Sequence, residues 1–220
     1  MLDVKATEKA LIGITNILKR FVGAKGYWID SGTLLGFVRD DAINQLDHDL
    51  DIRILPGRLP EEKMPDLVSE LWKLGFGCIN ANLGKRAELN CTNTKACVKL
   101  DLKFAYKDDN LLWVYCWEQP SSVDEPRVHA YPIRFFKKMG TVKYKGRVYP
   151  CPSPVEEYLT WHYGKQWKEF KTGEGAADMT DMTWDHMYGP PCSMSPSELM
   201  AKRKEIANYK AVGVVRSEAA

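Results

Sequence analysis

Two long stretches of the chain carry apolar residues at helical spacing. In the first, Leu11, Ile14 and Leu18 repeat every three to four positions, which predicts an amphipathic helix over about residues 3–22. A second helix is predicted to begin at a proline and to cover about residues 60–74. Glycines follow both stretches and are expected to end the helices.

Three other stretches have the pattern of strands. Residues 27–29 form a short run rich in aromatic and β-branched side chains. Residues 49–54 and 98–105 alternate strictly between apolar and charged positions, so each is predicted to bury one face. Residues 111–149 are read as β-rich material that includes a hairpin at 144–148.

The pattern becomes helical after Pro150. Ser153–Glu156 and Ser195–Glu198 both match a capping box with proline at the first helical position. Residues 171–191, rich in Gly, Asp, Met and Pro, are expected to form a loop or an irregular lid.

These elements predict an α/β (α+β) fold in which helices flank a mixed sheet. We expect residues 1–150 to form the catalytic core and residues 151–220 to form a helical C-terminal extension packed on it.

Composition narrows the class of protein. The 220 residues are 45% hydrophobic and 27% charged, which is ordinary for a globular chain. The net charge of +2 and the scattered lysines argue against nucleic acid as the main partner. No apolar run approaches the roughly 20 residues that cross a bilayer, and the amphipathic N-terminus does not resemble a secretory signal. Six cysteines without a C-x-x-C pair predict reduced thiols and a cytoplasmic location.

The candidate chemistry is carried by carboxylates on the alternating strands. Asp49 and Asp51 share one strand face, roughly 6–7 Å apart at their bases. Two like charges so placed repel each other, and a divalent cation such as Mg²⁺ would remove the repulsion. If the strands are neighbours, Asp101 completes a cluster that could bind metal or take a proton from an attacking hydroxyl. We expect Asp49 and Asp51 to face solvent and to contribute little to stability.

A glycine turn precedes this strand and offers a phosphate site. Gly32 and Thr33 open a short helix that is expected to end near Val38, so free N–H groups and the positive end of a helix dipole would face an anion. Arg39 has the planar fork that binds phosphate oxygens.

Each of these features also has an ordinary structural explanation. A D-x-D pair is common on solvated strands, a Gly-Thr turn can be a plain helix cap, and Asp101 alone is more often a surface residue. Arg39 could simply pair with Asp40 or Asp41. The order of strand, turn, helix, acidic strand and second acidic strand makes chemistry the better interpretation.

At these residues the sequence resembles the LicD/fukutin-type phosphotransferases of the nucleotidyltransferase-fold superfamily. Their pattern is an aromatic-rich strand, then G-T-L-L-G-x-x-R, then D-x-D-x-D, and here it falls on Tyr27–Ser31, Gly32–Arg39 and Asp47–Asp51. A helix that ends in Tyr-Gly after a proline-rich turn is similar to residues 152–164. One departure is Asn44–Leu46, where the family usually has Ile-Pro-Trp, which leaves the substrate open.

The resemblance implies a nucleotidyltransferase-like fold and transfer of a phospho-alcohol group. The donor would be a CDP-alcohol or another nucleotide, the acceptor a sugar or glycan hydroxyl, and the product CMP. Asp49, Asp51 and Asp101 would be the catalytic and metal-binding residues, with Mg²⁺ or possible Mn²⁺ as the ion. Gly32, Thr33 and Arg39 would bind the donor.

Two other functions stay open at this point. The first is transfer of NMP from an NTP with release of pyrophosphate, and the second is a non-catalytic binding module of the same fold. The sequence leaves undecided whether Asp47, His162 or the pair Lys85 and Arg86 touch substrate.

Several histidine, cysteine and aromatic residues are assigned structural roles. His48 is expected to point away from the acidic face, and His162 to lie on a helix surface. A zinc site is disfavoured because His186 and Cys192 lack a partner pair with zinc spacing. The remaining aromatic residues of the β-rich region are expected in the core, with base stacking as the alternative: Trp113, Tyr115 and Trp117.

Overall fold

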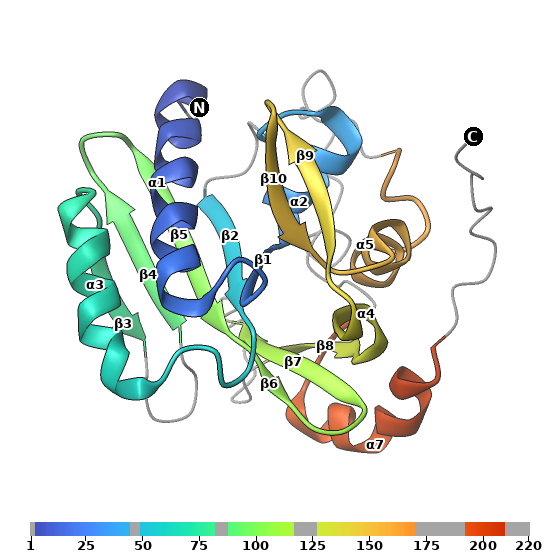
Figure 1. Cartoon of the computed structure of the whole chain (residues 1–220). Helices are drawn as coiled ribbons and strands as arrows, with labels where there is room; N and C mark the ends of the chain where they lie inside the picture. Colours follow the sequence, from blue (N-terminus) through green and yellow to red (C-terminus); the bar gives the residue numbers. More distant parts are fainter. Residues whose placement is uncertain (1–2, 45–48, 82–87, 117–126, 170–191, 210–220) are drawn as a thin grey trace, which may run out of the picture.

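A five-stranded mixed sheet organises the computed structural model (Figure 1). The structure describes residues 3–44, 49–81, 88–116, 127–169 and 192–209. The sheet has the order β1-β2-β5-β4-β3, and β2 and β5 are its parallel pair. Its strands are β1 (Tyr27–Ile29), β2 (Asp49–Ile54), β3 (Gly77–Ala81), β4 (Glu88–Asn93) and β5 (Val98–Phe104). The predicted mixed sheet of an α+β fold is confirmed.

Two helices lie side by side over one face of this sheet (Figure 1). They are α1 (Val4–Val22) and α3 (Met64–Lys73), the latter preceded by the 3₁₀ turn η2 (Glu61–Lys63). The Asp3 side chain caps α1 by accepting the Ala6 N–H at 3.1 Å. The apolar residues of β2 alternate toward one face and are fully buried, so the polar residues of β2 point to the opposite face.

The second half of the chain adds two smaller sheets. One has the order β11-β8-β7-β6, and the other is the hairpin of β9 and β10. The short helix α4 (Arg134–Lys137) separates them and was not predicted. The bounds of the strands are β6 (Tyr106–Lys107), β7 (Leu111–Cys116), β8 (Arg127–Pro132), β9 (Gly140–Tyr144), β10 (Arg147–Cys151) and β11 (Ser193–Met194). The predicted β-rich region and its hairpin are confirmed.

Among the described residues, two C-terminal helices follow, and only one has the predicted cap. In α7 (Pro196–Ala207), Ser195 makes a complete capping box with Glu198. In α5 (Val155–Tyr163) the capping box is wrong, because the helix begins one residue late and Pro154, which has no side-chain oxygen, is the N-cap. The division at residue 150 remains a prediction.

The expectation of reduced thiols is wrong at one pair. Cys78 on β3 and Cys91 on β4 face each other across the antiparallel ladder and form a disulfide. The sequence did not predict β3 or β4, so this proximity could not be seen. Among the described residues, no helix has the length and apolar character needed to cross a membrane.

Candidate active site

The glycine turn is tied directly to the acidic strand. It forms α2 (Ser31–Leu35), which continues into the π-helical turn η1 (Gly36–Asp40). The Gly32 N–H donates to Asp51 Oδ2 at 3.2 Å, and the Asp51 N–H donates to Thr33 Oγ1 at 2.9 Å. The turn and the carboxylate therefore hold each other in place before any ligand binds.

The second glycine of the G-T-L-L-G motif has a steric role. A Cβ atom at Gly36 would lie 2.5 Å from the Ala42 carbonyl oxygen, which is backbone and cannot move aside easily. Only glycine fits at this close approach.

Two of the three predicted carboxylates lie directly opposite each other, and the third lies two positions earlier on the same face of β2. Asp51 and Asp101 are register partners on the parallel strands β2 and β5, while Asp49 is paired with Lys99. Asp51 and Asp101 are 7% and 9% exposed, and Asp49 is half-buried at the start of its strand. Side chains directly opposite on neighbouring strands share a face, so Asp51 and Asp101 point the same way.

An arginine lies at the centre of this face. Arg53 contacts Asp30 and Asp51 at 3.2 Å each and Asp101 at 3.6 Å, and its side chain is 2% exposed. Lys103 adds a second cation at 2.8 Å from Asp101. The expectation of a solvated, repelling carboxylate is therefore wrong for Asp51, and Asp101 is not a surface residue. The reason is that Arg53 and Lys103 share the strand face with the acidic residues and pair with them.

Glu88 is a further acidic member that sequence reasoning missed. It lies opposite Lys103 in the register of β4 and β5, with an ion-pair distance of 3.8 Å. Burial raises the pKa of Glu88 to about 7, and the neighbouring Asp101 charge adds to the rise although Lys103 opposes it. Burial also works against ionisation of Asp101, but Lys103 and Arg53 outweigh it and lower the pKa of Asp101 to about 2.

The negative charges and carboxylate oxygens of this strand face fit a divalent cation. The ionised carboxylates Asp30, Asp51 and Asp101 contact the cations Arg53 and Lys103, and Glu88 beside them has a raised pKa. Asp101 Oδ1 and Glu88 Oε2 are buried and have no donor group beside them among the described residues, and the two side chains hydrogen-bond each other when Glu88 is protonated. Hard oxygen donors with excess negative charge are the ligands that Mg²⁺ and Mn²⁺ prefer. The donor set of Asp51 and Asp101, with Asp49 and Glu88 nearby in the sheet, is therefore suited to the predicted metal.

Asp30 anchors the site to the C-terminal half. It is fully buried, its Oδ2 contacts Arg53, and its Oδ1 accepts a short hydrogen bond from the Tyr158 hydroxyl of α5. Burial raises the pKa of Asp30, but Arg53, His162 and Tyr158 outweigh that effect and lower it. Asp30 is therefore ionised, and its charge holds the Arg53 guanidinium in position beside Asp51 and Asp101.

Arg39 has a different partner from the one proposed for it. Its Nε and Nη2 donate to the Asp40 carboxylate at 2.8 and 2.6 Å, which is the ordinary explanation weighed above. A phosphate would have to compete with this fork-like pair or bind beside it. Donor binding by Arg39 stays a prediction.

His162 is not on a helix surface. It is 3% exposed, and its Nδ1 shares a hydrogen bond of 3.0 Å with the Tyr131 hydroxyl. Burial lowers the pKa of His162 to about 3. The reason is that α5 turns this residue toward β8 rather than toward solvent. Trp113 and Tyr115 are half-buried and cluster with Tyr106. The remaining candidates lie outside the described residues: Asp47, His48, Lys85, Arg86, Trp117 and His186.

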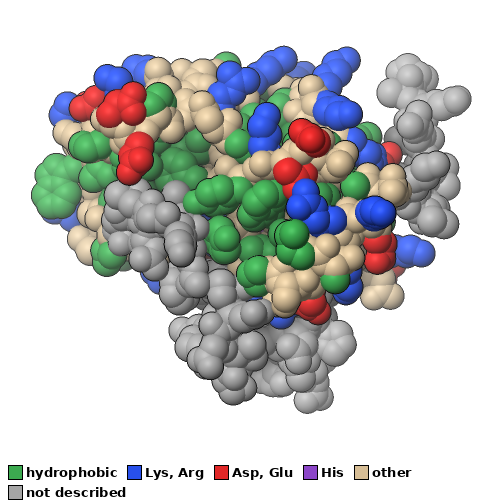
Figure 2. Space-filling model, turned by 90° about the horizontal axis from the view of Figure 1, so that it is seen from below, with side chains coloured by type: hydrophobic (Ala, Val, Ile, Leu, Met, Phe, Trp, Pro, Cys, Tyr) green, Lys and Arg blue, Asp and Glu red, His purple; other side chains and the backbone are tan. Residues whose placement is uncertain are grey.

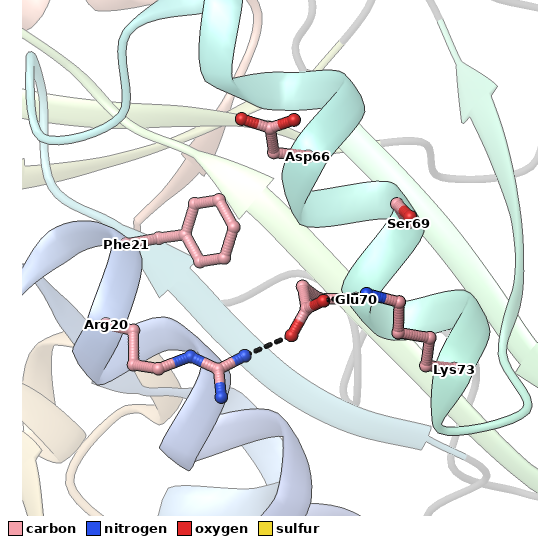
Figure 3. A pocket seen from close by; sticks show the side chains of 6 residues that line it. All are labelled: Arg20, Phe21, Asp66, Ser69, Glu70 and Lys73. Carbon is pink, nitrogen blue, oxygen red and sulfur yellow. Dashed lines mark hydrogen bonds and ion pairs between the residues drawn. The ribbon is translucent and has the colours of Figure 1, made fainter.

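Two surface hollows lie away from the carboxylates. The pocket of Figure 3, of about 350 Å³, lies between α1 and α3, and Arg20 and Glu70 form an ion pair inside it. A hollow of about 200 Å³ lies where Ile54 and Phe104 point, on the face opposite to Asp51. Neither hollow includes a predicted site residue. Hydrophobic side chains also gather on the face of the molecule seen in Figure 2.

Comparison with known protein families gives the class of this chain. A sequence profile described as "LicD/FKTN/FKRP, nucleotidyltransferase domain" matches residues 25–154, more than half of the chain. The chain belongs to this family, as the motifs at residues 27–51 suggested. Membership implies phosphotransferase or nucleotidyltransferase-like activity in general, with a nucleotide-type donor and an acceptor. No curated protein sequence matches the chain.

Proposed function

We propose that the chain moves a phospho-alcohol group from a CDP-linked donor to a sugar or glycan hydroxyl and releases CMP. The observation that carries the proposal is the buried acidic face, where Asp51 and Asp101 lie opposite each other beside the Gly32 turn. This arrangement suits a pyrophosphate whose charge is neutralised by a cation at the carboxylates, beside a turn that Asp51 already holds in place.

Each residue has a part in the proposed reaction. Asp49, Asp51 and Asp101 would hold Mg²⁺ or Mn²⁺, and a bound ion would neutralise the negative charge of the pyrophosphate. Gly32 and Thr33 would place the donor phosphates. Asp101 would orient the acceptor hydroxyl for in-line attack.

The proposed transfer exchanges one phosphorus–oxygen bond for another. The acceptor oxygen forms a bond to the distal phosphorus of the CDP-alcohol, and the bond from that phosphorus to the bridging oxygen breaks. The bridging oxygen leaves on CMP, and the hydroxyl proton passes to a carboxylate of the acidic face and then to water. Arg39, if it leaves Asp40, would stabilise the departing CMP.

The compartment is a separate prediction. A cytoplasmic location follows from the cysteine pattern, but the Cys78–Cys91 disulfide argues against it, because disulfides persist mainly in oxidising compartments.

Phosphorus NMR separates this proposal from its rivals. The full chain is incubated with Mg²⁺, a panel of CDP-alcohols and simple sugars, and in parallel with NTPs. The proposal predicts CMP and a new phosphodiester, and Asp51→Asn should abolish both. Pyrophosphate from an NTP with every CDP-alcohol intact would instead identify a nucleotidyltransferase. Binding without turnover of any donor would identify a non-catalytic module.

A further inference from the structure

A group of side chains of the types that bind metals lies where β8, β11 and α5 meet. Within the described residues, one donor atom from each of His129, His162 and Cys192 lies within 4.8 Å of the others. Cys192 is fully buried and His162 is nearly so, whereas His129 is half-buried. None of the three takes part in the proposed transfer.

Three separate elements build this cluster. His129 lies on β8, and Cys192 directly precedes β11, whose Ser193 is the register partner of His129. The Ala130 N–H donates to the Cys192 carbonyl at 3.0 Å, which holds the cysteine against β8. His162 comes from α5, which is fixed to β8 by the Trp161 indole N–H donating to the Ala130 carbonyl at 2.7 Å.

We propose that His129, His162 and Cys192 form a zinc site that ties β8, β11 and α5 together. Two imidazole nitrogens and one thiolate are the donors that Zn²⁺ selects, and Mg²⁺ avoids sulfur. A tetrahedral zinc ion with bonds of about 2.0–2.3 Å holds its donors about 3.3–3.6 Å apart. The Cys192 Sγ to His162 Nδ1 distance is already 3.8 Å, so small side-chain rotations suffice.

One neighbour has to move for zinc to bind. The Tyr131 hydroxyl lies 3.0 Å from His162 Nδ1, the nitrogen that faces Cys192, and must rotate away before this nitrogen can reach the metal. Three protein donors leave a fourth position for water. The sequence could not predict the site, because its ligands stand at positions 129, 162 and 192 without a short zinc spacing.

The site would support the acidic face from a distance. α5 carries both His162 and Tyr158, and Tyr158 holds Asp30 beside Arg53. A metal that fixes α5 on β8 therefore limits the movement of Asp30. This role is structural, and the ion takes no part in the transfer.

Cobalt substitution tests the site directly. The full chain, purified without a histidine tag or thiol reductants, is stripped with EDTA and titrated with Co²⁺ in excess Mg²⁺. We expect one equivalent to bind with a thiolate-to-cobalt absorption band in the near ultraviolet and strong tetrahedral bands in the visible. Zinc should displace the cobalt and raise the melting temperature. A weak octahedral spectrum without the thiolate band overturns the proposal on the wild-type chain alone.

Variants assign the band to these residues. Cys192→Ser should lose the thiolate band. His129→Gln should weaken cobalt binding by more than the loss of an outer-shell partner does, which is about 10–100-fold. Cys97→Ser, which changes an exposed free cysteine, is the matched control and should bind as the wild type does. Circular dichroism checks that each variant folds. Retention of the band in folded Cys192→Ser also overturns the assignment.

Discussion

Asp51 and Asp101 lie directly opposite each other on parallel strands, and one arginine contacts both. Without Arg53 the two buried carboxylates would repel each other in a medium of low dielectric constant. The arginine thus keeps the two carboxylates together on one face of the sheet.

Replacing Asp51 should cost both activity and stability. Asp51→Asn removes the charge that Arg53 contacts at 3.2 Å, so we expect unfolding to become easier by about 1–3 kcal/mol. Turnover should fall at least about 10²-fold, because the residue lies at the centre of the developing charge. Asp49→Asn, at a half-buried position, is the control that should lose activity but keep its urea midpoint. Equal midpoints for the two variants would contradict the assignment of Asp51 to the buried network.

Removing Arg53 should have the largest effect on stability. Arg53→Met leaves Asp30 buried without its guanidinium partner, and breaking such a pair costs about 3–5 kcal/mol. Arg58→Met, at an exposed position of the loop after β2, is the control. Chemical denaturation measures both. If the Arg53 and Asp30→Asn effects simply add in the double variant, the two residues do not interact as described.

The hydroxyl of Tyr158 should matter more than its ring. Tyr158→Phe keeps the packing against Tyr131 but removes the donor to Asp30, so we expect a loss of about 1–3 kcal/mol. Activity should fall with it if Asp30 positions Arg53. The half-buried Tyr115 on β7 offers a comparison, and Tyr115→Phe should change both quantities less. A Tyr158→Phe chain with wild-type stability and turnover would exclude this positioning role.

Glu88 should make stability depend on pH in the absence of metal. Its folded pKa is raised from 4.5 to about 7, so between these values the folded chain keeps a proton that the unfolded chain has released. The folded state then binds more protons, and stability falls as the pH rises through this window. Glu88→Gln should remove that fall. Urea midpoints in EDTA from about pH 4 to about pH 8 measure it, and parallel curves for the two chains would refute the assignment.

The sequence predicted the motif and the strand faces but not the pairing of charges. Alternation correctly placed Asp51 and Arg53 on one face of β2, and the likeness to a known family located the turn at Gly32. It did not show that Asp51 and Asp101 are buried, because burial depends on what packs over the sheet. The family motif included Asp30, yet its role depends on Tyr158, a contact across 128 positions that no local pattern encodes.

The missing elements have a similar cause. β3 and β4 lack clear alternation, so neither Glu88 nor the disulfide could be predicted. His162 was misplaced because helical periodicity says which side chains share a face but not what lies opposite that face. What escaped prediction in each case was contact between segments far apart in the chain.

The parallel pairing of β2 and β5 also sets the order in which the site can assemble. The connection between these strands holds α3, β3 and β4, so all of that chain must be synthesised before Asp51 can meet Asp101. Such long-range pairings form slowly, because loop closure comes before the contacts that compensate for it. A one-residue slip would put Leu50 or Ile52 opposite Asp101 and turn apolar side chains toward the charged face. The acidic face therefore exists only in molecules in which β2 and β5 have paired in this register.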